Sequence, residues 1–429
     1  MRAEILTIGD ELCRGEIVDT NSSYLAARLW ELGITTRWMT SCNDDEADIR
    51  AAMSQAVARA DVVVCSGGLG PTEDDLTVDV VSALAGVAPV VDEPAKVRMQ
   101  ERFGRLLSSG QVPGRDVEEL TQIQLRQVRV PAGSRVLGNP VGLAPGFEQA
   151  LSGVPVICLP GVPRELHGIM DQALASRLAE LREAAGGEIE RIAKRMYRAF
   201  GRGESQVSQA CRGMIDGIAG ASIHYQVKFP ETLVKLVVRD RDQAAADARL
   251  ATLDAELRRR LAGVVYGEGE DTLVEKVTRR LIATGTTVAT AESCTGGLIG
   301  ELLTRMPGSS RAFVGGAVAY SDAEKVRQLG VAQATLDTHG AVSEETVREM
   351  AAGAISRFGV KMAVAVSGIA GPDGGTPDKP VGTVWVALAR GSGAITTKKL
   401  SWPGQRDQVR LLSAWWALKL IDDALEETR

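Results

Sequence analysis

Aromatic residues, histidines and long apolar runs are all scarce in this chain of 429 residues. Phe, Trp and Tyr together make up 4% of the sequence, and there are three histidines, His167, His224 and His339. No apolar run approaches the roughly 20 residues of a membrane-spanning helix, so we expect no contact with a membrane. The first residues, MRAEILTIGDEL, lack the basic region and apolar segment of a secretory signal. We therefore expect a cytoplasmic protein.

The six cysteines lie far apart, at positions 13, 42, 65, 158, 211 and 294. This spacing fits neither a zinc site nor a disulfide framework, so we expect buried thiols in a reducing compartment. Cys294 is the exception and an alternative nucleophile, because it lies in a turn where a helix N-terminus would activate a thiolate. The formal net charge of −6 argues against direct binding of nucleic acid.

The length of the chain exceeds that of one ordinary domain, and the pattern of elements predicts three. Residues 1–170 alternate strands and helices, which is typical of a three-layer α/β domain with a mainly parallel sheet. Residues 171–265 begin with a helix at 172–184 and continue as a small α+β domain. Residues 266–429 form a second α/β domain, with Tyr266 to Gly269 predicted as the linker that leads into it.

Two loops of the N-terminal domain follow predicted parallel strands, at the edge where such sheets bind ligands. Their glycines expose backbone N–H groups that suit a phosphate, whereas their acidic residues would repel one unless a divalent metal lay between. The glycines are Gly67, Gly68 and Gly70, and the acidic residues are Glu11, Asp74 and Asp75. The sequence thus predicts a diphosphate held through a metal that also activates water. Alternatively, the acidic residues only favour the start of the next helix.

The stretch from Thr286 to Lys325 carries most of the candidate chemistry. Thr286 to Ala291 is predicted as a strand, and ESCTGG, Glu292 to Gly297, as the turn into a helix. Such a turn offers free N–H groups to an anion, and its glycines let a ligand approach closely. The turn residues expected to contact a substrate are Thr295, Gly296 and Gly297.

A second part of this stretch brings a tyrosine and a lysine together. Ser321 to Glu324 is typical of a capping box, which makes Tyr320 and Lys325 neighbours in space. A nearby serine could act as nucleophile with the lysine as its base. The candidates are Ser310 and Ser293, and residue chemistry alone does not choose between them. Each residue also has a structural interpretation, as a cap, a turn residue or a solvated lysine.

Two further features fit the same site. A long glycine-rich loop follows Ser367, and we expect it to form a wall of the substrate site with Ser367 at its base. Arg406 lies near a predicted helix start and could bind a nucleotide phosphate. A Ser-His-Asp hydrolase would have to use His339 in this domain, and no nucleophile-elbow sequence accompanies it. A serine-lysine mechanism fits better.

Several C-terminal motifs resemble the nicotinamide-nucleotide amidase domain of the competence/damage-inducible protein CinA family. They are AESCTGG, PGSSRAFVGGAVAYSDAEK, AVSEET and SGIAGPDGGTPDKPVGTV, within roughly residues 268 to 429. The resemblance implies hydrolysis of the carboxamide of nicotinamide mononucleotide to nicotinate mononucleotide and ammonia, without a cofactor. It also implies Ser310 as nucleophile, Lys325 as base, and Tyr320 and Ser293 as supporting hydroxyls.

The N-terminal motifs GDEL, DTNS, SGGLGPTEDD, GNPVGLAPGF and LPGVPRE resemble the molybdopterin-binding fold in the version that begins CinA-type proteins. Relatives on this fold differ in activity. For the CinA type, the resemblance implies a metal-dependent ADP-ribose pyrophosphatase. Glu11, Asp74 and Asp75 would face a divalent metal of unknown identity, while Asn21 and the glycines from Gly67 to Gly70 would cradle the substrate.

The middle domain resembles the KH-like domain of the same family, in fold alone. Its Gly-Arg-Gly-Glu loop carries an acidic residue where a nucleic-acid phosphate would pass, so we expect a spacer and a homodimer contact. Together these features predict a bifunctional enzyme that acts on nicotinamide mononucleotide and ADP-ribose. The alternative is a non-catalytic protein that senses nucleotides or serves partners in competence or recombination.

Overall fold

The computed structural model describes residues 1–109, 116–186 and 190–427. The chain folds into two compact units, one of Met1–Ile192 with Asp240–Gln243, and one of Ala193–Arg239 with Ala244–Arg429. The first unit is an N-terminal α/β domain, and the second combines a small α+β domain with a C-terminal α/β domain. The predicted fold class is thereby confirmed. Within the described residues, no helix is long and apolar enough to cross a membrane.

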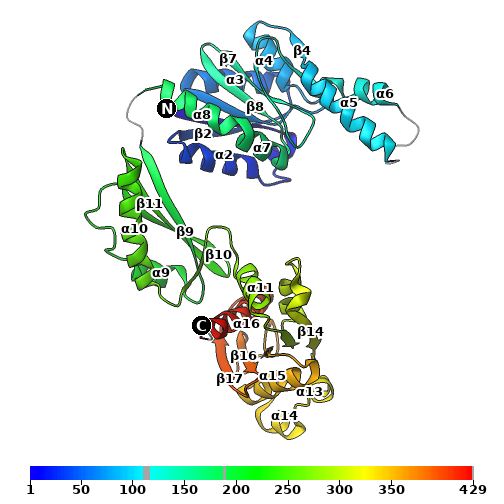
Figure 1. Ribbon diagram of the computed structural model, residues 1–429, viewed down its shortest axis with the longest axis vertical. Coiled ribbons are helices and arrows are strands. Elements are labelled where there is room, and N and C mark those ends of the chain that lie inside the picture. Colours follow the sequence, from blue (N-terminus) through cyan, green and yellow to red (C-terminus); the bar gives the residue numbers. More distant parts are fainter. Residues whose placement is uncertain (110–115, 187–189, 428–429) are drawn as a thin grey trace. The chain divides into compact units, whose positions relative to one another are not determined.

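The N-terminal domain is a three-layer sandwich (Figure 1). Its sheet has the order β2-β1-β3-β8-β7-β6, in which the first four strands are parallel, β7 is antiparallel to β8, and β6 is antiparallel to β7. The strands are β1 (Arg2–Ile8), β2 (Thr35–Cys42), β3 (Val62–Ser66), β6 (Arg135–Leu137), β7 (Gly146–Leu151) and β8 (Val154–Leu159). Every residue of β3 is buried, because helices cover both faces of the sheet.

The helices of this sandwich form two layers. Apolar faces of α3 and α4 cover one side of the sheet, and those of α2, α7 and α8 cover the other. The helices are α1 (Asp10–Cys13), α2 (Thr20–Glu31), α3 (Glu46–Arg59), α4 (Thr77–Ala85), α7 (Pro163–Ile169) and α8 (Ala175–Ala184). The helix predicted in the middle domain is α8, whose Leu178 is fully buried in the N-terminal core. The boundary therefore lies near Ile192 and not at residue 170.

A smaller layer extends beyond the sheet (Figure 1). It consists of α5 (Glu93–Ser108), α6 (Val117–Gln124) and a short antiparallel pair, β4 (Pro89–Val91) and β5 (Arg129–Pro131). Its own core is built by Ala95, Met99 and Phe103, at the four-residue spacing of one helix face, together with Val128.

The middle domain has a four-stranded sheet in the order β10-β11-β9-β12. Its elements are β9 (Arg191–Ala199), α9 (Glu204–Ala210), β10 (Ala221–Lys228), β11 (Glu231–Asp240), α10 (Gln243–Arg260) and β12 (Val265–Glu268). Tyr266, predicted in a linker, instead lies in β12, which pairs with β9. The Tyr266 side chain is buried and donates a hydrogen bond to Glu231, which also accepts one from Arg198 at 2.7 Å. These hydrogen bonds attach the segment to the sheet of the middle domain.

The C-terminal domain has a five-stranded sheet in the order β14-β13-β15-β16-β17, parallel as far as β15 and antiparallel beyond it. Its strands are β13 (Val288–Glu292), β14 (Phe313–Val318), β15 (Met362–Gly368), β16 (Thr383–Arg390) and β17 (Ile395–Ser401). Its helices are α11 (Leu273–Thr284), α12 (Leu298–Thr304), α13 (Asp322–Leu329), α14 (Gln333–His339), α15 (Glu344–Phe358) and α16 (Arg406–Glu427). Helices α11, α12 and α16 cover one face, and α13, α14 and α15 cover the other.

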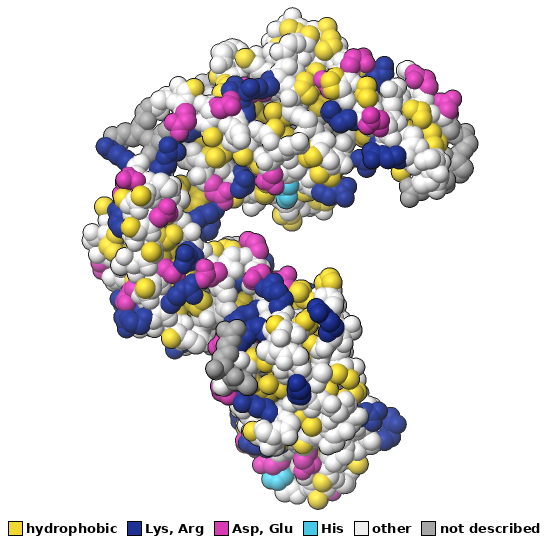
Figure 2. Space-filling model, in the orientation of Figure 1, with side chains coloured by type: hydrophobic (Ala, Val, Ile, Leu, Met, Phe, Trp, Pro, Cys, Tyr) yellow, Lys and Arg dark blue, Asp and Glu magenta, His cyan; other side chains and the backbone are white. Residues whose placement is uncertain are grey.

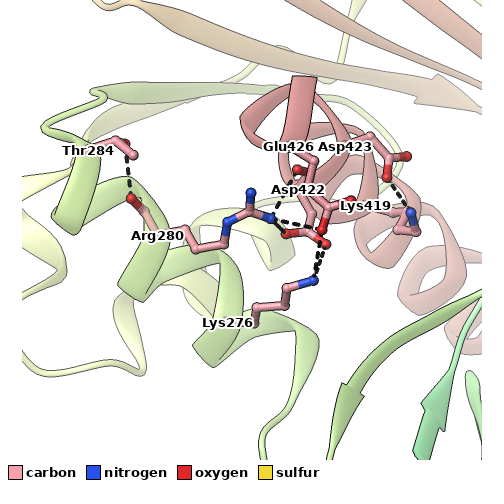
Figure 3. A network of polar contacts seen from close by, with 7 residues as sticks. All are labelled: Lys276, Arg280, Thr284, Lys419, Asp422, Asp423 and Glu426. Atoms are coloured by element: carbon pink, nitrogen blue, oxygen red, sulfur yellow. Dashed lines mark hydrogen bonds and ion pairs between the residues drawn. The ribbon is translucent and has the colours of Figure 1, made fainter. Parts of the chain in front are cut away.

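Helix α16 contacts both the middle domain and α11. Phe200 of the middle domain packs against Trp415 and Trp416, so that the middle and C-terminal domains share a core. On another side, Asp422 accepts hydrogen bonds from Lys276 at 2.8 Å and from Arg280, which joins α16 to α11 (Figure 3).

Candidate active site

Three parallel strands of the C-terminal domain, β14, β13 and β15, end at one edge of the sheet. Glu292, the last residue of β13, pairs with Val318 on one side and with Val366 on the other. Because neighbouring strands lie about 4.8 Å apart, the residues that follow these pairs lie side by side. They include Ser293, Tyr320 and Ser367. This is the edge at which parallel α/β sheets bind their ligands.

Lys325 reaches this edge from α13. Ser321 caps the helix by accepting a hydrogen bond from the N–H of Glu324 at 3.3 Å, so Lys325 is the fourth helical residue, as predicted. Its side chain is buried, and the residue is 1% exposed. The amine donates to the Tyr320 carbonyl oxygen at 3.3 Å and to Asp322 Oδ1 at 3.4 Å. Both contacts are long, and a lysine amine has three N–H groups, so one direction is left for a further partner.

Ser293 has a fixed backbone and an unengaged hydroxyl. Its N–H donates to the Val366 carbonyl oxygen at 2.9 Å, and its own carbonyl oxygen accepts from the Gly296 N–H at 3.0 Å. Among the residues that the structure describes, none forms a hydrogen bond with the Ser293 hydroxyl. Ser293 thus follows β13, the strand that pairs with β14, and β14 leads to the helix of the buried Lys325.

The turn after β13 does not offer the anion site predicted from the sequence. Glu292 is buried, and its Oε2 accepts hydrogen bonds from the N–H groups of Gly297 and Ile299, both at 3.0 Å. Its Oε1 accepts from Gly300 N–H, also at 3.0 Å. The N-terminus of α12 is thus occupied by a carboxylate of the chain itself. Gly296 and Gly297 are still needed for the turn, because their φ angles of 60° and 94° would strain residues that carry a side chain.

Thr295 lies in the same turn and has a hydroxyl without a hydrogen-bond partner among the described residues. It is fully buried. Such a group in a native structure calls for an explanation, and a ligand would supply one. Its carbonyl oxygen accepts from Arg410 Nη2 at 3.0 Å. Arg410 was not predicted as a site residue from the sequence, although the four-residue spacing from Arg406 places both side chains on one face of α16.

Arg406 and Ser367 hold the loops around the site. Arg406 donates to the Gly371 carbonyl oxygen at 2.7 Å and to the Tyr320 hydroxyl at 2.9 Å. Both acceptors are neutral, so the guanidinium charge remains uncompensated by these contacts. Ser367 is buried and donates its hydroxyl to the Ala341 carbonyl oxygen at 2.7 Å, which makes it a support of the site.

A cavity of about 550 Å³ lies in the N-terminal domain, at the ends of β1, β3 and β8. Gly67, Gly68 and Gly70 line it as predicted, and the first two have φ angles of 114° and 66°. Asn21, predicted to contact substrate, instead donates to Ser66 Oγ at 2.9 Å and to the Gly161 carbonyl oxygen at 2.7 Å. It therefore joins the end of β3 to the loop after β8, which lines the cavity.

The three acidic residues predicted to bind a metal do not form a ready site. Asp75 Oδ1 accepts from the Gly70 N–H at 2.6 Å, and its Oδ2 accepts from the Thr72 N–H at 2.8 Å, so the carboxylate organises its own loop. Glu11 and Asp74 line the cavity with exposed side chains. Within residues 1–109, 116–186 and 190–427, no group of three or more His, Cys, Asp or Glu residues is arranged to hold a metal ion.

Negative charge is nevertheless concentrated in this cavity. Asp44 also lines it, and burial raises the pKa of that carboxyl group. A hydrogen bond from the backbone of Asp10 lowers the pKa, whereas the charges of Asp10 and Glu11 raise it further. A cation in the cavity would relieve this repulsion.

Three family models match consecutive parts of the chain. They are the probable molybdopterin binding domain at residues 4–180, the damage-inducible protein CinA KH domain at 194–267 and the CinA C-terminal domain at 270–425. A CinA-like protein of Anaeromyxobacter dehalogenans is 42% identical over 99% of this chain and 100% of its own length. The chain belongs to the CinA family.

A second relative of full length agrees with this membership. A CinA-like protein of Geotalea uraniireducens is 37% identical over 100% of the chain and 99% of its own length. The crystal structure of a competence/damage inducible protein from Agrobacterium tumefaciens is 41% identical, with a TM-score of 0.35. It covers 36% of this chain and 97% of its own.

In this CinA-family chain, Ser310 does not lie beside Lys325, contrary to the sequence prediction. Ser310 is exposed in a short 3-10 turn (Ser309–Arg311) just before β14, whereas Tyr320 and Lys325 follow the other end of that strand. A six-residue strand is roughly 17 to 20 Å long. Ser310 and Lys325 are therefore at opposite ends of β14, and of the two candidate serines Ser293 is the one at the end where Lys325 lies.

Cys294, the alternative nucleophile of this CinA-family site, is buried. Burial raises the pKa of its thiol to about 12, and the nearby charge of Arg410 lowers it by less. A thiol in this state carries almost no thiolate at neutral pH, and the thiolate is the reactive form. The raised pKa of the thiol therefore favours Ser293 over Cys294.

Proposed function

We propose that the C-terminal domain hydrolyses the carboxamide of nicotinamide mononucleotide, with Ser293 as nucleophile and Lys325 as base. The observation that carries this proposal is the position of an unengaged serine hydroxyl and a buried lysine amine at adjoining strand ends. A module that only binds nucleotides has no need of a lysine buried beside a serine. Membership of the CinA family supports the same reaction through the resemblance of the C-terminal motifs.

The proposed reaction has two stages. Ser293 Oγ attacks the carboxamide carbon, and Lys325 takes the hydroxyl proton and passes it to the leaving nitrogen, so that ammonia departs. A nicotinoyl ester of Ser293 remains. Water then attacks this ester, Lys325 accepts the proton of the water and returns it to Ser293, and nicotinate mononucleotide is released.

Other residues of the site fit the remaining parts of the substrate. The N–H groups of Gly297, Ile299 and Gly300 are taken by Glu292, so the developing oxyanion needs other donors. Thr295 is the best placed, since its buried hydroxyl has no partner within the described chain. Arg406 would pair with the phosphate of the substrate, because its present hydrogen-bond acceptors are neutral.

Ammonia release from nicotinamide mononucleotide by the full-length protein, without added metal, tests this proposal. We expect stoichiometric ammonia and nicotinate mononucleotide, and slower turnover of nicotinamide riboside, which lacks the phosphate. Binding of nicotinamide mononucleotide without ammonia release would contradict the enzyme and favour the alternative of a nucleotide sensor.

We further propose that the N-terminal cavity binds ADP-ribose and hydrolyses its diphosphate. The glycine-rich turn at the ends of parallel strands, in a cavity of about 550 Å³, favours this second activity. A divalent metal fits if it arrives with the diphosphate, because Mg²⁺ takes one or two carboxylates and completes its shell with phosphate oxygens and water. Glu11 and Asp74 would hold it, and the ion would neutralise the diphosphate charge.

Formation of AMP and ribose 5-phosphate from ADP-ribose, with and without Mg²⁺, tests the second activity. We expect the full-length protein to require the metal, and the Glu11→Gln/Asp74→Asn variant to lose roughly 100-fold or more in rate. Glu16→Gln/Glu73→Gln is a suitable control, since both of its residues are exposed and neither lines the cavity. Equal rates in the two variants would contradict the assignment.

A further inference from the structure

A second cavity, of about 460 Å³, lies in the N-terminal domain between α5 and the loop of residues 139–143. Three arginines line it, Arg98, Arg102 and Arg105, while Glu101 is the one acidic residue among the described residues of its wall. In a chain with a formal net charge of −6, this concentration of positive charge is unusual. Figure 2 shows Lys and Arg side chains on the surface over this part of the domain.

The three arginines form one stripe along α5. Their spacings of four and three residues place them within roughly 60° of arc around the helix axis. The adjoining face carries the apolar residues that anchor α5 to its own core, Ala95, Met99 and Phe103. Because this anchor fixes the rotation of the helix, the arginine stripe faces the cavity whether or not a ligand is present.

The charges of this stripe are not neutralised by the protein. Among the described residues, no carboxylate forms an ion pair with any of the three arginines. Arg102 donates to the Val141 carbonyl oxygen at 3.1 Å, which is a neutral acceptor. Arginines four residues apart on a helix repel one another weakly, and a bound anion would relieve this repulsion. Guanidinium groups bind phosphate through paired, charge-assisted hydrogen bonds.

The wall opposite the arginines is held in place by Asn139, which also contacts two residues that line the first cavity. Asn139 is buried, and its Oδ1 accepts hydrogen bonds from the N–H groups of Val141 at 2.9 Å and Gly142 at 2.7 Å. Its Nδ2 donates to the Ala144 carbonyl oxygen at 2.8 Å and to Glu165 Oε2 at 2.7 Å. Ala144 and Glu165 line the first cavity. A single loop thus separates an acidic cavity from a basic one.

We propose that the arginine-lined cavity binds a phosphate group of a small phosphorylated ligand, with Arg98, Arg102 and Arg105 as its anion-binding side chains. This site goes beyond the activity proposed for the first cavity. The phosphate can belong to the ligand of the first cavity, which would then extend around the loop of residues 139–143, or to a separate phosphorylated molecule. In both cases the arginines would bind a phosphate group.

Calorimetric titration of the full-length protein with inorganic pyrophosphate, without divalent metal and at low ionic strength, tests this site. The Arg98→Gln/Arg105→Gln variant removes two exposed charges from the cavity and leaves Arg102 in place. The control is Arg37→Gln/Arg50→Gln, which removes two charges elsewhere in the same domain, that of the exposed Arg37 and that of the half-buried Arg50, which pairs with Glu46 at 2.9 Å. We expect the cavity variant to bind pyrophosphate about 10- to 100-fold more weakly, and the control within about twofold of the unmodified protein.

A repeat of the titration with saturating ADP-ribose identifies the source of the phosphate. Loss of pyrophosphate binding would show that ADP-ribose itself reaches the arginines, and unchanged binding would show a separate phosphorylated ligand. The proposal is overturned if the unmodified protein does not bind pyrophosphate, or if the two variants bind it equally. Absence of ADP-ribose binding would contradict only the activity proposed for the first cavity, because the pyrophosphate titration does not depend on it.

Discussion

Replacement of Ser293 by alanine is expected to lower the rate of ammonia release from nicotinamide mononucleotide by roughly 10³- to 10⁶-fold. The reason is that no acyl-enzyme can form without the Ser293 hydroxyl, and that Ser367, which lies at the end of the neighbouring strand β15, already donates its hydroxyl to the Ala341 carbonyl oxygen. Steady-state assays of the purified full-length protein measure this loss. Circular dichroism should be unchanged, because the Ser293 hydroxyl makes no hydrogen bond within the described residues.

Ser310→Ala is the matched control for this prediction. It removes the same atom from an exposed residue at the opposite end of β14, so its activity is expected to stay within about twofold of the unmodified protein. Lys325→Met removes the amine and keeps an apolar chain of similar length in a buried position. It should match Ser293→Ala in activity. Loss of activity in Ser310→Ala, with activity retained in Ser293→Ala, would restore the order of nucleophiles inferred from the sequence.

The position of Lys325 was predictable from sequence, whereas the identity of its serine was not. The cap at Ser321 is a local signal, and it correctly gives Lys325 as the fourth helical residue. Ser293 and Ser310, however, both lie within a few tens of residues of this lysine. The choice depends on the parallel pairing of β13 with β14, which puts the end of β13 and the start of α13 at the same edge. Neither the residues around Ser293 nor those around Ser310 indicate which strands pair with each other.

The role of Glu292 was also not predictable from the sequence. A glutamate before SCTGG suggests a polar turn, and nothing local indicates that its carboxylate folds forward to accept three N–H groups. Likewise, the apolar face of α8 predicts a helix but not the core that it joins. Elements and caps could thus be read from the sequence, while the partners of buried polar and apolar faces required the three-dimensional structure.

Replacement of Asp422 by alanine is expected to destabilise the C-terminal domain by about 3 kcal/mol. Asp422 is 1% exposed and holds Lys276 at 2.8 Å together with Arg280, so that α16 is tied to α11 (Figure 3). Removing one member of a buried ion pair typically costs roughly 3 to 5 kcal/mol, because the remaining charges stay desolvated. We place the loss at the lower end, since Glu426 still contacts Lys276 at 3.3 Å and Arg280 at 3.2 Å.

Glu426→Ala is the control that separates the effect of burial from that of ion pairing. Glu426 pairs with the same two cations, but its side chain is 57% exposed. Exposed ion pairs contribute little, so this variant should lose less than about 1 kcal/mol.

Thermal unfolding can be followed by tryptophan fluorescence, to which Trp385, Trp402, Trp415 and Trp416 of this domain contribute. For a domain of this size, the Asp422 variant should unfold roughly 6 to 12 °C lower. Equal shifts in the two variants would show that burial does not set the strength of this network, and that the α11–α16 contact is held by its apolar core.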